Sequence, residues 1–77
     1  MKNKSTIPIS DENILEEVLT LFNKNNNTNI IIENIIDDEA TLVEINKNGC
    51  SDAQLFYVAF YYGMRIQKEI IETSRNF

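Results

Sequence analysis

The sequence predicts an α+β domain in which an antiparallel β-hairpin packs against two helices, in the order helix, strand, strand, helix. Apolar residues recur at three- and four-residue spacing over 10–25 and again over 52–73, whereas β-branched residues crowd 29–46. A hairpin covered on one face by two helices is the simplest arrangement that buries all four apolar faces. We expect residues 1–9 to be a flexible tail and residues 10–77 to form one compact domain.

The first helix is expected to follow Ser10, whose hydroxyl can cap the free backbone amides of the first turn. Acidic residues come next, where the helix dipole favours negative charge. Asn25–Asn27 should end the helix, because asparagine tolerates left-handed backbone and competes for backbone hydrogen bonds. Its apolar stripe consists of Ile14, Leu15, Val18, Leu19 and Phe22.

Two strands are predicted between the helices. Ile30–Ile36 and Thr41–Ile45 are rich in β-branched residues, and the polar run Asp37–Glu39 separates them as a turn. Asn48-Gly49 is a strong turn signal. It either ends the sheet or begins a short third strand around Cys50.

The second helix should begin with a capping box, because Ser51 is followed three residues later by Gln54. We expect a long helix over 52–73 with an apolar stripe toward the core. Its members are Leu55, Ala59, Tyr62, Gly63, Ile66 and Ile70, widened by Phe56, Val58 and Phe60.

The sequence lacks the usual apparatus of catalysis. It has no histidine, so the commonest general base and metal ligand is missing, and its one cysteine provides no thiol pair for zinc. Asp37–Glu39 lacks the spaced ligands and glycine of a calcium loop, so we interpret it as a solvated turn. We predict that the protein is not an enzyme and uses no cofactor or metal. The lone Cys50 suits a reducing compartment, so we expect a cytoplasmic location.

The charge is concentrated in the middle of the chain. Residues 10–52 carry ten acidic and two basic side chains, a net −8, against −5 for the whole protein. Such a field repels nucleic acid and anionic membranes and attracts basic surfaces. We expect no direct nucleic-acid or membrane binding, and a protein partner with a basic surface. The carboxylates predicted to meet it are Glu16, Glu17, Asp37, Asp38, Glu39 and Glu44.

A second candidate surface lies on the last helix. If the predicted stripe faces inward, an outer flank brings together Tyr57, Tyr61, Arg65 and Lys68. Tyrosine and arginine are enriched in binding hot spots. Ala59 and Gly63 lie four residues apart and allow another backbone to approach closely. That backbone is either the first helix of the same chain or a second copy in a homodimer.

The pattern Ala59-Phe60-x-x-Gly63-Met64-Arg65 resembles a helix of small accessory proteins of phages and mobile elements in low-GC Gram-positive bacteria. With Ile45-Asn46-Lys47-Asn48-Gly49, it is also similar to a class of small acidic anti-CRISPR proteins. That resemblance implies an inhibitor whose carboxylates occupy the basic DNA-recognition groove of a nuclease. This chain lacks the acidic loop that follows the second helix in that class.

Two functions follow from these patterns. The first is an acidic inhibitor or decoy of a basic, nucleic-acid-handling protein. The alternative is a regulatory or scaffolding protein that docks a partner, or a second copy of itself, through the aromatic last helix.

Overall fold

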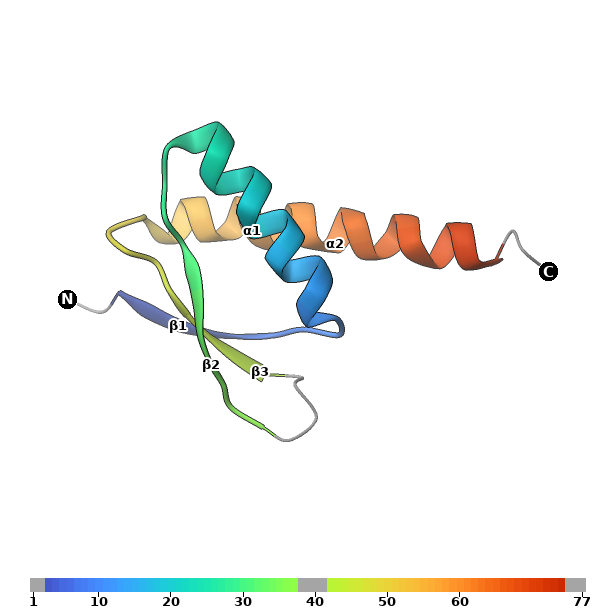
Figure 1. The fold of residues 1–77 in the computed structure, drawn as a ribbon, viewed down its shortest axis with the longest axis horizontal. Helices are drawn as coiled ribbons and strands as arrows, with labels where there is room; N and C mark the ends of the chain where they lie inside the picture. The colour runs from blue at the N-terminus through green and yellow to red at the C-terminus, as the bar shows by residue number, and fades with distance from the viewer. Residues whose placement is uncertain (1–2, 38–41, 75–77) are drawn as a thin grey trace.

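The computed structural model describes residues 3–37 and 42–74 and shows an α+β fold (Figure 1). Two helices accompany a three-stranded antiparallel sheet. Its elements, in chain order, are β1 (Lys4–Pro8), α1 (Glu12–Asn26), β2 (Ile31–Ile35), β3 (Leu42–Asn46) and α2 (Asp52–Ser74). The predicted class, both helices and the antiparallel hairpin are therefore confirmed.

The predicted element order is wrong in one respect, because the chain begins with a strand. Lys4–Pro8 lies within the segment expected to be a flexible tail, yet it forms β1 and pairs antiparallel with β3. Its two inward side chains, Ser5 and Ile7, are half-buried, and Ile7 packs against the core. Pairing supplies partners for backbone groups of β3 that would otherwise stay unpaired. A five-residue strand with one inward apolar side chain is too short to be recognised by its pattern.

The sheet has the order β1-β3-β2, so β3 is central. An irregularity between Ile32 and Asn34 shifts the register of β2 by one residue. Asn48 and Gly49 both have positive φ, at 48° and 89°, and the Cys50 amide donates to the Lys47 carbonyl across the turn. This turn ends the sheet and leads into α2. The third strand is β1, not a strand around Cys50.

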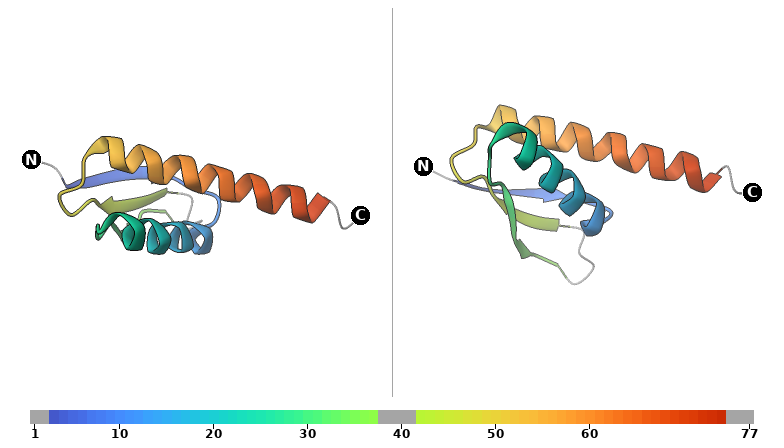
Figure 2. Two further views of the ribbon diagram at one scale, coloured as in Figure 1. Left: turned by 90° about the horizontal axis from the view of Figure 1, so that it is seen from above. Right: turned by 45° about the horizontal axis from the view of Figure 1, so that its top comes forward.

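Both helices pack on one face of the sheet, as two further views show (Figure 2). Along β3, Val43 and Ile45 are fully buried, whereas the alternating residues face the other side. Five residues of α1 meet this face, and α2 contributes Val58. The buried core is formed by Ile9, Ile14, Leu15, Val18, Leu19, Phe22, Ile30, Val43, Ile45 and Val58.

The N-cap of helix α1 lies one residue later than predicted, and the helix ends within the predicted stop, Asn25–Asn27. Its N-cap is Asp11, whose carboxylate accepts a hydrogen bond from the Ile14 amide at 3.2 Å. Ser10, the predicted cap, instead contacts the hydroxyl of Tyr62 in α2. Asn27 closes the helix in a left-handed conformation, with φ 55° and ψ 45°.

The Tyr62 hydroxyl links α2 to the start of α1 by hydrogen bonds. It accepts hydrogen bonds from the backbone amides of Ser10 and Asp11, at 2.7 and 3.0 Å. These amides lie at the helix N-terminus, where backbone donors lack helical partners.

We expect Tyr62→Phe to lower the free energy of unfolding by about 1–2 kcal/mol, because it removes the acceptor and leaves both amides without it. Urea denaturation followed by circular dichroism measures the loss. The matched control is Tyr57→Phe, since Tyr57 is 59% exposed, and it should change stability by less than about 0.5 kcal/mol. Equal effects of the two variants would contradict the structural role given to the Tyr62 hydroxyl.

Candidate docking face on helix α2

Helix α2 is fixed firmly at its N-terminal end. The capping box is confirmed: the Ser51 hydroxyl accepts from the Gln54 amide at 3.2 Å, and the Gln54 side chain accepts from the Ser51 amide at 3.0 Å. Just before it, the buried Lys47 donates from Nζ to the Asp52 carboxylate. The helix runs for 23 residues, and its C-terminal turns extend past α1 and the sheet (Figures 1 and 2).

Within the part of the chain that the structure describes, no helix combines the length and apolar character needed to cross a membrane.

The core-facing side of α2 differs from the predicted stripe. Val58 is fully buried, and Leu55, Tyr62 and Ile66 are half-buried against the core. Five predicted members of the stripe are instead exposed: Phe56, Ala59, Phe60, Gly63 and Ile70.

 These five residues are exposed because α2 is oriented about its own axis with the Val58 side toward the core. The helix is turned because Val58 and Tyr62, not Ala59 and Gly63, fill the space above β3 and α1.

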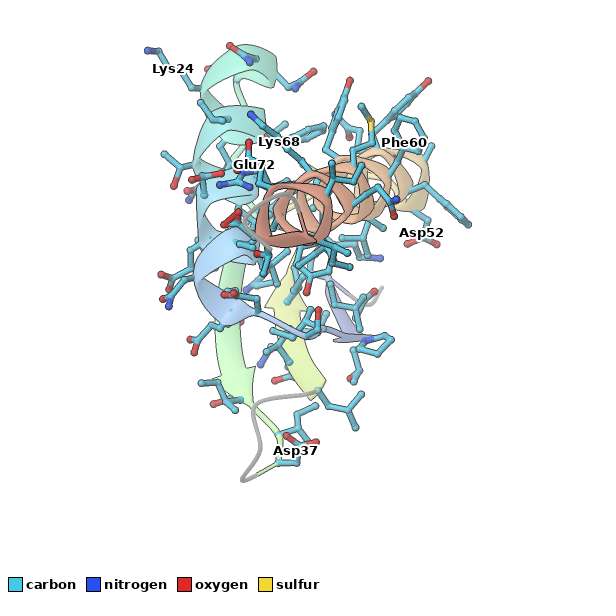
Figure 3. All side chains as sticks on the ribbon, turned by 90° about the vertical axis from the view of Figure 1, so that its right-hand side faces the viewer. Lys24, Asp37, Asp52, Phe60, Lys68 and Glu72 are labelled. Atoms are coloured by element: carbon cyan, nitrogen blue, oxygen red, sulfur yellow. The ribbon has the colours of Figure 1, made fainter. Side chains whose placement is uncertain are left out.

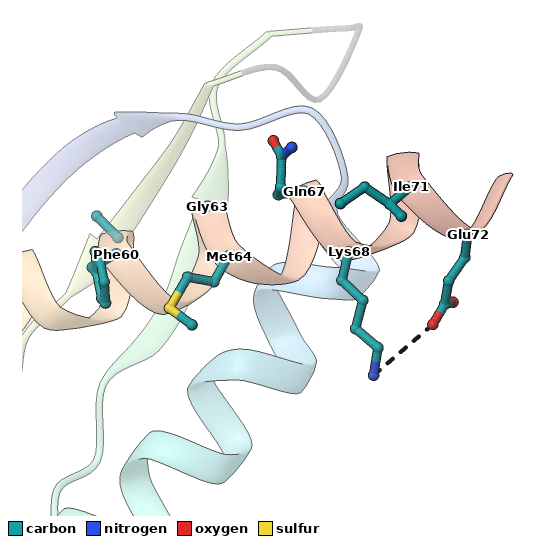
Figure 4. A pocket seen from close by; sticks show the side chains of 8 residues that line it. Phe60, Gly63, Met64, Gln67, Lys68, Ile71 and Glu72 are labelled. Atoms are coloured by element: carbon teal, nitrogen blue, oxygen red, sulfur yellow. Dashed lines mark ion pairs between the residues drawn. The ribbon is translucent and has the colours of Figure 1, made fainter. Parts of the chain in front are cut away.

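The solvent-facing side of α2, opposite the core, is apolar along most of its length. We define the outer α2 face as Phe56, Phe60, Gly63, Met64, Gln67 and Ile71. Phe56 is 78% exposed, Phe60 62% and Met64 55%. None of the six side chains carries a charge. Figure 4 shows five of these residues along α2, with the Lys68–Glu72 ion pair at their border, where Nζ and Oε1 are 4.0 Å apart.

Gly63 has open space around it. A Cβ atom built at this position would meet no atom within 4 Å, and Ala59 is likewise exposed. The interpretation that these small residues let α2 pack closely on α1 is therefore wrong. Because Ala59 and Gly63 have little or no side chain, a shallow depression lies beside Phe60 on the surface of α2.

The predicted flank of tyrosines and basic residues is only partly brought together. Tyr61 is 46% exposed and lies between two phenylalanines, with ring centroids 6.5 Å from Phe22 and 5.9 Å from Phe60. Arg65 turns toward α1, where its Nε donates to the Glu17 carboxylate at 2.7 Å. This hydrogen bond raises the pKa of Arg65 above its usual value, so the side chain stays charged.

Tyr57 and Lys68 are exposed like Tyr61, whereas Arg65 is half-buried. Lys68 also lines a groove between α1 and α2, together with Leu21, Tyr61 and Met64. The groove joins the outer α2 face along one side, since Met64 belongs to both.

The predicted acidic residues do not form one surface. Glu16 and Glu17 lie on α1, and Glu17 forms an ion pair with Arg65. Glu44 lies on the opposite face of the sheet from the helices, where its carboxylate accepts from Asn34 Nδ2 at 2.9 Å and lies 4.0 Å from Lys4 Nζ. The half-buried Asp37 lies at the far end of the hairpin from α2 (Figure 3). Asp38 and Glu39 fall outside the described residues.

The described residues contain no group of three or more His, Cys, Asp or Glu side chains that could hold a metal ion. Cys50 is half-buried and packs against the core beside the start of α2. The outer α2 face, where Phe56 and Phe60 are the most exposed of the large hydrophobic residues, is the candidate functional site.

Comparison with known proteins finds no family model, no curated protein and no solved structure that matches this chain. The function must be argued from the chain's own residues.

Sequence reasoning placed Phe56 and Phe60 in the core and so missed this face. One signal could have identified it. Residues 53, 56, 60, 63, 67 and 70 follow alternating spacings of three and four, which is the heptad pattern of a helix that packs against another helix. Four of these six residues are apolar, namely Ala53, Phe56, Phe60 and Ile70, so the spacing predicts a second contact surface beside the one that meets the core.

Proposed function

We propose that this protein is a non-enzymatic, cytoplasmic binding protein of the regulatory or scaffolding kind, which docks a protein partner through the outer α2 face. The observation that carries the proposal is the exposure of Phe56 and Phe60 on the side of α2 opposite the core. The lack of histidine and the free Cys50 support the non-enzymatic role and the reducing compartment.

The physical argument rests on the cost of exposed aromatic surface. A monomer seldom exposes a contiguous apolar patch without a use for it, because burying such a patch against a partner is favourable. Phenylalanine offers a large, rigid contact area, and an adjacent depression at Gly63 can receive a side chain of the partner. A rim of charged residues, Lys68 and Glu72, borders the patch, which is the usual anatomy of a protein interface.

A second candidate is an acidic inhibitor or decoy of a basic, nucleic-acid-handling protein encoded by a phage or mobile element. The net charge of −5 and the exposed Glu16 on α1 favour it. A complex formed by such charges weakens steeply as salt rises, whereas a desolvated aromatic contact changes little.

Affinity capture from lysate of the source organism distinguishes the two candidates. We expect Phe56→Ser/Phe60→Ser to lose the captured partner, and wild-type binding to persist at about 0.5 M salt, because apolar contacts are not screened. The comparison variant is Glu16→Gln/Glu44→Gln, which should retain the partner. Loss with the glutamine variant, retention with the serine variant and release by salt would support the decoy instead.

A further inference from the structure

We infer that the occupant of the outer α2 face is a second copy of this chain, packed antiparallel along α2. The inference rests on the proposed docking function and names its partner. Three properties of α2 point to it: the position of its aromatic half, the arrangement of its charges, and the area that it exposes.

The two halves of α2 complement each other. The N-terminal half, over the sheet, exposes Phe56 and Phe60, whereas the half that projects beyond α1 exposes Ile70 and Ile71, at 56% and 44%. An antiparallel copy lays its aromatic half over the projecting half of the first, and two-fold symmetry repeats the contact. A parallel pair would leave both projecting halves beyond reach of the phenylalanines of the other copy.

The middle of the helix offers a matching hollow and projection. With the two-fold axis between residues 63 and 64, Gly63 faces Met64 of the second copy, and Phe56 faces its Ile71. Gly63 leaves open space where the flexible Met64 side chain, 55% exposed, can insert. Heptad spacing keeps the contact line continuous from residue 53 to residue 70.

Charge favours this face for contact between two acidic chains. Within residues 53–73, Arg65 and Lys68 balance Glu69 and Glu72, so this segment is neutral, although the whole chain carries −5. Two copies that meet along α2 keep the acidic α1 and hairpin away from the contact line. Any contact through the acidic residues 10–52 would instead set net negative surfaces against each other.

The exposed area is sufficient for a stable dimer. If six apolar side chains per copy each bury roughly 100 Å², the interface removes about 1,200 Å² in total, which is the lower bound of specific protein interfaces. The six are Phe56, Phe60, Met64 and Ile71 of the outer α2 face, with the exposed Tyr57 and Ile70 beside it.

Light scattering of the 77-residue chain, from low to high micromolar concentration, tests the association. We expect wild type to reach twice the 8.9 kDa chain mass. Phe60→Lys should weaken the dimer roughly a hundredfold, because symmetry places the unpaired charge in the interface twice. Ile31→Lys is the matched control, since Ile31 is 43% exposed on β2, away from α2, and should leave the dimer intact.

Gly63→Leu separates loss of pairing from loss of folding. A Cβ at this position meets no atom within 4 Å, and the substitution removes a helix-destabilising glycine, so the monomer should keep its circular dichroism spectrum and melt no lower than wild type. It fills the hollow that receives Met64 and should therefore yield monomer.

Disulfide crosslinking tests the antiparallel direction, in a Cys50→Ser background because Cys50 is the only native thiol. Met64→Cys should crosslink to its own copy, because the two-fold axis passes beside it. Ala53→Cys should not, since antiparallel pairing puts the two sites about 30 Å apart at 1.5 Å per residue. Efficient crosslinking at both positions indicates a parallel pair and overturns the inference.

A wild-type protein that is monomeric at high micromolar concentration overturns self-pairing. So does a dimer that dissociates in Ile31→Lys and stays intact in Phe60→Lys. The docking function fails separately. A monomer whose captured partner depends on Phe56 and Phe60 leaves docking standing without self-pairing. If the protein is a monomer and the Phe56→Ser/Phe60→Ser variant still captures the same partner, both proposals are wrong.

Discussion

Leu15→Ala is expected to lower the free energy of unfolding by about 3–4 kcal/mol, because it removes three carbons from a fully enclosed site. Leu15 has no exposed surface and lies on α1 among the residues that meet the sheet. A domain of this size has only about 4–12 kcal/mol of stability in total, so the variant should be close to unfolding. Urea denaturation monitored by circular dichroism gives the difference in midpoint and slope.

Leu21→Ala is the matched control for this substitution. Leu21 lies on the same helix and loses the same atoms, but it is 55% exposed. Its replacement should cost less than about 1 kcal/mol, since little apolar surface is removed from water there. Comparable losses for the two leucines would contradict the orientation of α1 on the sheet.

Asn23→Ala is expected to cost about 2–4 kcal/mol, because its side chain replaces a missing piece of backbone pairing. Its Oδ1 accepts from the Ile30 amide at 2.9 Å, and its Nδ2 donates to the Ile30 carbonyl, also at 2.9 Å. The same Oδ1 accepts from the Thr28 hydroxyl. Ile30 is only 1% exposed, so both of its backbone groups would be left buried without these partners.

Asn25→Ala tests whether the effect belongs to this amide and not to asparagine in general. Asn25 is exposed near the end of the same helix and should change stability by less than about 0.5 kcal/mol. Hydrogen exchange supplies a local measurement: the Ile30 amide should lose protection in Asn23→Ala before the sheet as a whole opens. Unchanged protection of that amide would refute the role assigned to Asn23.

Local sequence patterns predicted the elements whose signals lie close together in the chain. Ser51 and Gln54 are three residues apart, and they form the capping box as expected. Asn27 ends α1, and Asn48-Gly49 turns the chain, because their left-handed conformations depend only on local backbone preferences. The role of Asn23 was not predicted, because its hydrogen bonds to Ile30 cross the end of the helix and leave no trace in periodicity.

The sequence by itself determined the α+β class, the two helices, the antiparallel hairpin and the turn at Asn48-Gly49, because these depend on neighbouring residues. Only the tertiary structure decided that Lys4–Pro8 is a strand, since its partner β3 lies some forty residues away in sequence. It also decided which side of α2 is buried. Both sides of that helix are apolar, so periodicity supports either, and packing of Val58 and Tyr62 against β3 and α1 selects one. The phenylalanines left outside by that choice form the candidate docking face.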